Sequence, residues 1–183
     1  MECGFLVSSR PRPQRNSKIN HDLRSVSCPD IAKDALQTNV KTGCFLTEDV
    51  SLFDAPFFSM TAQEAAGMDP MQRLMLEVAY ESLENAGIPM QSLPGTMTSV
   101  YCGCFTGDYG DLANSDIYDA APYQATGKGK AMLSNRVSWF FDLRGSSFTV
   151  DTACSSSLYA LHLACQSLRL KESKMVSHSN VRA

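Results

Sequence analysis

The chain has 183 residues, 44% hydrophobic and 19% charged, and these values predict one globular domain rather than a disordered or fibrous chain. The 16 basic and 19 acidic residues give a net charge of −3, which argues against a nucleic-acid binder because those proteins usually carry a basic excess. No apolar run approaches the roughly 18 residues of a membrane span, so we expect no membrane-spanning helix.

The N-terminus and the cysteines indicate a reducing compartment. The apolar stretch before Ser8 is shorter than the roughly 7–15 residues of a secretory signal, and the seven cysteines are an odd number. Basic residues between positions 10 and 18 leave a transit peptide open beside a solvated basic tail. We expect reduced thiols and a cytoplasmic location. Cys102-x-Cys104 and three scattered histidines lack the spacing of a zinc site, so no metal site is predicted.

Residues 1–35 differ from the rest of the chain. They contain several proline, serine and asparagine residues and no sustained periodicity. This composition predicts a poorly ordered lead-in. The apolar density rises from about Leu36, which marks the expected start of the folded domain.

The clearest helix is predicted for residues 70–86. Asp69 is a favourable N-cap, Pro70 suits the first helical position, and Gln72 can complete a capping box. Apolar residues recur at helical spacing along this segment. Gly87 suits the left-handed residue that follows a helix, so both ends of the helix are marked.

Shorter elements follow in chain order. Residues 98–105 predict a strand that is apolar on both faces and therefore buried between layers. Residues 106–130 predict a loop with one short helix, and residues 131–141 a helix. Phe148 to Val150 predict a strand that leads into a new helical pattern from Ser155. One face of that helix is expected to carry Leu158, Leu161, Cys165 and Leu168.

Cys154 lies where the periodicity changes from strand to helix, and it is the candidate nucleophile. A thiol at a helix N-terminus faces free backbone N–H groups and the positive end of the helix dipole, which favour the thiolate. The same N–H groups could hold an oxyanion. A buried structural cysteine is the alternative. His162 is no convincing base, because eight residues along one helix correspond to about 12 Å.

The sequence Asp-Thr-Ala-Cys-Ser-Ser-Ser at 151–157 resembles the active-site motif of β-ketoacyl synthase domains, especially those of type I polyketide synthases. The resemblance covers roughly residues 36–175, and residues 45–58 are most similar to the fungal multidomain type. Further similar blocks lie at 53–58, 64–70, 72–74, 80–81, 83–87, 103–109 and 135–138. We interpret 36–175 as part of the N-terminal domain of such an enzyme and 176–183 as a divergent tail.

The resemblance implies a thiolase-like α/β/α/β/α fold and a homodimer. It implies that Cys154 accepts an acyl chain from the phosphopantetheine arm of an acyl carrier protein. A malonyl thioester on a second carrier would then undergo decarboxylative Claisen condensation, as in polyketide and fatty acid biosynthesis. No cofactor is expected to be bound by this domain itself.

Three departures from the family pattern shape these expectations. Residues 1–35 show no apolar strand followed by a Cys-Arg-Phe-Pro-like stretch, so the first strand is expected to be missing. The family's two catalytic histidines, in His-Gly-Thr-Gly-Thr and Gly-His contexts, are not found after Cys154. Ser146 stands where proline is usual. We therefore expect the chain alone to be inactive in condensation and prone to aggregate.

Alternative interpretations remain open from the sequence. The resemblance stops at Val176, and a partial or mis-spliced gene product is one hypothesis for residues 176–183. Such a truncated product would be non-catalytic and would only dimerise or interact with full-length synthases. An unrelated thiol hydrolase is a third possibility, which would need a base that the sequence does not show.

Overall fold

The structure is a computed structural model that describes residues 4–7, 52–113 and 122–180. All of these residues belong to one compact unit of the chain. The predicted lead-in from residue 8 onward and the start of the predicted domain lie outside the described residues. In chain order the elements are β1 (Gly4–Val7), α1 (Ala62–Gly67), α2 (Pro70–Asn85), η2 (Met90–Ser92), β2 (Thr98–Gly103), α3 (Asp108–Ala113), α4 (Gln124–Lys128), α5 (Met132–Phe140), β3 (Ser147–Val150), α6 (Ser156–Arg169) and β4 (Met175–Asn180).

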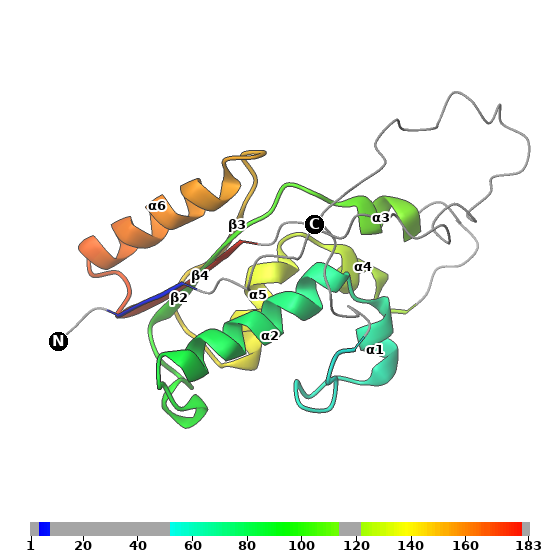
Figure 1. The fold of residues 1–183 in the computed structure, drawn as a ribbon, viewed down its shortest axis with the longest axis horizontal. Coiled ribbons are helices and arrows are strands. Elements are labelled where there is room, and N and C mark those ends of the chain that lie inside the picture. Colours follow the sequence, from blue (N-terminus) through cyan, green and yellow to red (C-terminus); the bar gives the residue numbers. More distant parts are fainter. Residues whose placement is uncertain (1–3, 8–51, 114–121, 181–183) are drawn as a thin grey trace, which may run out of the picture. The chain divides into compact units, whose positions relative to one another are not determined.

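The described strands form one parallel sheet with the order β1-β4-β2-β3. Helix α6 packs on one face against β2, β3 and β4, and α2 and α5 pack on the other face (Figure 1). All six residues of β2 are buried, as its two apolar faces predict. Because parallel strands end at the same edge, the segments after β2 and β3 lie close together.

Helix α2 confirms the predicted helix and both of its ends. The Asp69 carboxylate accepts a hydrogen bond from the Met71 N–H at 2.8 Å, and Gly87 has a φ of 68°. The predicted capping box does not form, because the Asp69 N–H donates to the Gly127 carbonyl instead. Gln72 is buried and its amide serves that same loop, so it is a core residue rather than a cap.

The expectation that the first strand is missing is wrong for this chain. Residues 4–7 form β1, which pairs in parallel with β4 from Gly4 opposite Met175 to Val7 opposite His178. A four-residue strand is too short to show a periodicity, yet it is long enough for the edge of a sheet. The segment predicted as a divergent tail also contributes, because β4 lies between β1 and β2.

Helix α6 begins as predicted, but it buries a different face. The buried positions carry small side chains: Ser156, Ala160, Ala164 and Ser167. Leu158, which was expected on the packed face, is 68% exposed. The small residues allow the helix to approach the sheet closely, where Ala160 and Ala164 pack with Tyr101 and Val176. The helix therefore turns its small residues, rather than its larger apolar side chains, toward the sheet.

The other face of the sheet carries the larger core. It consists of apolar side chains from α2, α5, β2 and the connecting segments, among them Met68, Met75, Leu76, Val100, Cys102, Leu133 and Val137. This buried layer supports the sheet on which the β3–α6 turn stands.

Candidate active site

Cys154 occupies the turn between β3 and α6, as the change of periodicity predicts. Its side chain is exposed, so the alternative of a buried structural cysteine does not hold. The preceding residue, Ala153, has a φ of 54°, in the left-handed region that L-residues other than glycine occupy at a cost of about 1–2 kcal/mol. The chain therefore makes a sharp, strained bend immediately before the thiol.

Serine hydroxyls stabilise this bend from within. The Thr152 N–H donates to Ser156 Oγ at 2.8 Å, and Ser156 Oγ donates to the Ala153 carbonyl at 2.6 Å. Ser155 Oγ donates to the Thr152 carbonyl at 2.7 Å. These two serines therefore hold the backbone on either side of the strained residue.

An ion pair anchors the turn from outside. Lys130 Nζ lies 2.9 Å from Asp151 Oδ2, and it also donates to the Phe105 carbonyl at 3.1 Å. Asp151 Oδ1 accepts from the Ala153 N–H at 3.2 Å. The hydrogen bond from Lys130 lowers the pKa of Asp151, and the same bond raises the pKa of Lys130. Asp151 belongs to the recognised motif, but no sequence signal pointed to Lys130.

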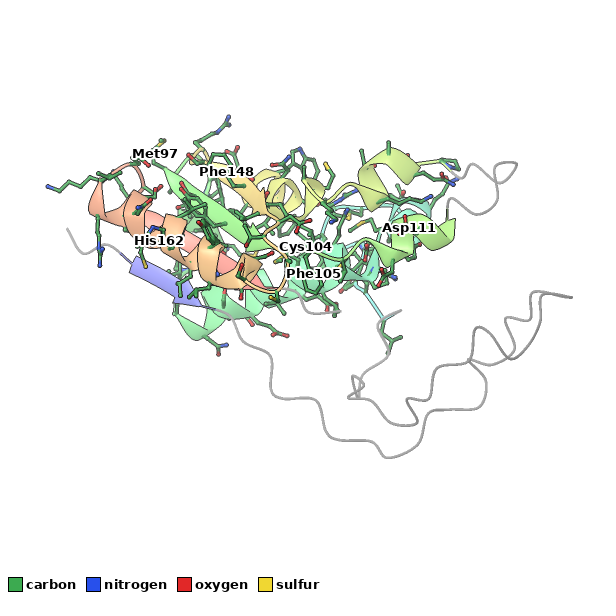
Figure 2. All side chains as sticks on the ribbon, turned by 90° about the horizontal axis from the view of Figure 1, so that it is seen from above. Met97, Cys104, Phe105, Asp111, Phe148 and His162 are labelled. Carbon is green, nitrogen blue, oxygen red and sulfur yellow. The ribbon has the colours of Figure 1, made fainter. Side chains whose placement is uncertain are left out.

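Gly103, the last residue of β2, makes room for the start of α6. A Cβ atom at this position would lie 2.7 Å from the Ser156 carbonyl carbon and the Ser157 nitrogen. Figure 2 shows the labelled Cys104 and Phe105, which follow Gly103, beside the end of α6 nearest the turn. The helix N-terminus and the exit of β2 are therefore in direct contact.

The two described histidines have different surroundings. His162 is exposed on α6, which agrees with the expected helix-face position (Figure 2). His178 is buried on β4, and its Nε2–H donates to the Ser157 carbonyl at 3.0 Å, because a carbonyl oxygen can only accept. Burial lowers the pKa of His178, and the hydrogen bond opposes this shift. The burial of His178 was not foreseen, since β4 itself was not predicted.

The remaining described cysteines are less accessible than Cys154. Cys102 and Cys104 are buried and Cys165 is half-buried, and all are free thiols. Burial raises the pKa of Cys102 to about 12, which makes it an inert core thiol. Within the described residues, no three His, Cys, Asp or Glu side chains are grouped as metal ligands. In the same part of the chain, no helix is long and apolar enough to cross a membrane.

A model for the beta-ketoacyl synthase N-terminal domain matches residues 6–177. This chain belongs to the β-ketoacyl synthase family. The highly reducing polyketide synthase cnsI of Penicillium expansum is 55% identical over 165 residues, which make up 90% of this chain and 6% of that protein. The highly reducing polyketide synthase alnA of Emericella nidulans is 62% identical over 132 residues, 72% of this chain and 5% of that protein. This chain thus spans only 5–6% of the length of these relatives.

Solved structures support the same assignment. The ketosynthase from module 6 of the bacillaene synthase of Bacillus subtilis 168 is 34% identical, with a TM-score of 0.63 over 73% of this chain and 22% of that one. An oxazolomycin ketosynthase domain from Streptomyces albus JA3453 is 38% identical, with a TM-score of 0.63 over 73% of this chain and 23% of that one. The expected thiolase-like α/β fold class is confirmed, with this chain as part of the N-terminal domain.

Proposed function

We propose that this chain carries the acyl-accepting part of a polyketide-type β-ketoacyl synthase, with Cys154 as the nucleophile. The observation that carries the proposal is the exposed thiol on a strained, braced turn at the start of α6. The turn has the strand–turn–helix form that presents nucleophiles above a sheet in other enzymes. Of the four described cysteines, Cys154 alone is exposed, which supports selective reaction there.

The first step is a thioester exchange. The Cys154 sulfur attacks the carbonyl carbon of an acyl chain carried on the phosphopantetheine arm of an acyl carrier protein. A bond forms between Sγ and the acyl carbon, the bond to the phosphopantetheine sulfur breaks, and the carrier leaves as a thiol with the proton. The Cys154 backbone N–H helps to hold the oxyanion of the tetrahedral intermediate.

The second step is condensation with a malonyl thioester on a carrier protein. The malonyl group loses CO₂, its carbanion forms a C–C bond with the acyl carbon, and the Cys154 thiolate leaves. In the family this step uses two histidines in contexts that the 183 residues do not contain. Each such electrostatic donor contributes about 2.7–4 kcal/mol. We expect the 183-residue chain by itself to accept an acyl group and not to condense it. The assembled enzyme is proposed to be a homodimer.

Mass spectrometry tests this proposal directly. The chain is incubated with hexanoyl-N-acetylcysteamine, and the acylated peptide is identified after proteolysis. Cys154 is expected to be acylated at least about 10-fold faster than Cys165, since the latter is half-buried. Cys154→Ala should leave the peptide that contains Cys165 as slow to react as in the wild-type chain. Equal labelling of Cys154 and Cys165 in the wild-type chain would contradict the proposal.

A further inference from the structure

We propose that Lys130 is a positioning residue for Cys154: its ammonium group ties Asp151 to the segment after β2 and so holds the turn that presents the thiol. This inference rests on the proposed role of Cys154. Lys130 itself does not need to touch the substrate, because it acts through the backbone of the turn.

The contacts of Lys130 join two segments at one edge of the sheet. Its Nζ bonds Asp151 Oδ2 just after β3 and the Phe105 carbonyl just after β2. The other carboxylate oxygen of Asp151 accepts from the Ala153 N–H. A continuous series of hydrogen bonds therefore runs from β2 through Lys130 and Asp151 to the residue that precedes Cys154.

Lys130 is held in place by the loop before it. The buried Gln72 amide donates to the carbonyls of Thr126, Gly127 and Gly129, at 3.1, 2.9 and 3.3 Å. Gly127 lies so close to the Gly67 backbone that a Cβ atom there would collide with it. The backbone immediately before Lys130 is thus fixed to α2. Because this backbone is fixed, the Lys130 side chain reaches Asp151 and the Phe105 carbonyl from a defined position.

The ion pair is too exposed to matter mainly for folding. The side chains of Lys130 and Asp151 are 41% and 48% exposed, and exposed ion pairs add little to stability. Ala153, by contrast, keeps a positive φ only while its surroundings enforce it. The contact at its N–H is one of those constraints. Removing the anchor should therefore loosen the turn much more than it destabilises the protein.

The test compares Lys130→Met with Lys130→Arg, and uses Lys174→Met as the matched control. Lys174 is exposed and lies just before β4, at the opposite edge of the sheet. Each variant is assayed for acylation of Cys154 by hexanoyl-N-acetylcysteamine, for alkylation of Cys154 and Cys165 by iodoacetamide, and for its melting temperature.

Lys130→Met is expected to slow acylation of Cys154 at least about 10-fold, since small displacements of a reacting group can cost about 100-fold. Lys130→Arg should recover most of the rate, because a guanidinium can bond both the carboxylate and the carbonyl. Cys165 alkylation, the melting temperature and the Lys174→Met variant should stay at the wild-type level. The same acylation rate in Lys130→Met and wild type would overturn the inference, as would no recovery in Lys130→Arg.

A second pair of variants separates this inference from the proposed function. Asp151→Asn and the double variant with Lys130→Met should be as slow as Lys130→Met alone, because all three lack the same ion pair. If the double variant lost as much acylation rate as the two single variants combined, the inference would be overturned. If the wild-type chain is not acylated at all, the proposed function fails. The inference about Lys130 is then overturned separately if iodoacetamide alkylates Cys154 at the same rate in Lys130→Met as in wild type.

Discussion

The backbone of Ser156 lies so close to Gly103 that a Cβ atom on the glycine would be 2.7 Å from the Ser156 carbonyl carbon. The neighbouring atoms are backbone, so no side-chain rotation can relieve this contact. Gly103→Ala is expected to push the start of α6 away from β2 and to destabilise the chain by about 1–3 kcal/mol. Urea unfolding measures the loss, and acylation of Cys154 should slow in parallel.

The control for this substitution is Gly110→Ala in α3. A Cβ atom at Gly110 would have its nearest contact at 3.8 Å, an ordinary van der Waals distance. Alanine is also the better helix former, so we expect no loss of stability. If Gly103→Ala were as stable and as reactive as Gly110→Ala, the close approach would not matter for the site.

Arg136 provides a second prediction because it is buried between α2 and α5. Its Nε donates to Gln72 Oε1 at 2.7 Å and its Nη1 to Glu64 Oε1 at 2.8 Å, with 6% of the arginine side chain exposed. Arg136→Met leaves both acceptors without this donor. The substitution should lower the free energy of unfolding by about 3–5 kcal/mol. Arg144→Met is the control, since the Arg144–Asp142 pair is 64% and 50% exposed and should be worth under about 1 kcal/mol. Similar losses of unfolding free energy in Arg136→Met and Arg144→Met would contradict a special role for the buried arginine.

The elements that the sequence predicts correctly depend on signals from residues that are adjacent in the chain. Helix α2 was predicted at both ends because Asp69, Pro70 and Gly87 act on adjacent backbone. The turn at Cys154 was predicted because two periodicities meet there. The Lys130–Asp151 pair was not, because 21 residues separate the two side chains and only the sheet brings them together. Strand β1 was missed for a similar reason, since its hydrogen-bond partner lies at the other end of the chain.

The face of α6 could not be predicted because the helix has two possible packing faces. Hydrophobicity favours the face that contains Leu158, whereas the structure packs the small residues Ala160 and Ala164 on the sheet. A small-residue face permits a short distance between helix and sheet. Leu158 then points away from the sheet and is 68% exposed.

This exposed face leads to a prediction about association. Leu158 and Tyr159 are 68% and 54% exposed on adjacent positions of α6. Apolar patches of this kind promote self-association. Leu158→Lys is expected to reduce aggregation of the 183-residue chain, measured by light scattering, without lowering its melting temperature. Leu52→Lys is the control, because Leu52 is 77% exposed elsewhere and should change association less. An equal reduction of aggregation by both substitutions would mean that exposed apolar residues in general, and not this face of α6, drive the association.

His178 makes stability depend on pH in a defined direction. Burial lowers its pKa from the ordinary value of 6.5, so the unfolded chain binds the proton more strongly than the folded chain. The contribution is therefore fully present above 6.5 and is lost as the pH falls toward the lower folded pKa. Urea unfolding at about pH 7.5 and about pH 5.5 should show a smaller loss for His178→Gln than for wild type. Glutamine can still donate to the Ser157 carbonyl without titrating. An equal loss in both proteins would exclude His178 as the cause.

The end of α6 allows a stabilising substitution. Lys171 has a φ of 59°, its N–H donates to the Leu168 carbonyl, and the Glu172 N–H donates to the Ser167 carbonyl, which is the hydrogen-bond pattern that usually ends in glycine. Lys171→Gly removes the steric cost of the left-handed conformation and adds flexibility to the unfolded chain, for a net gain of about 0.5–1 kcal/mol. Gly87→Ala, at the equivalent position after α2 with a φ of 68°, should lose about 1 kcal/mol. Thermal unfolding checks both, and a loss in Lys171→Gly would mean that the lysine side chain contributes more than its backbone conformation costs.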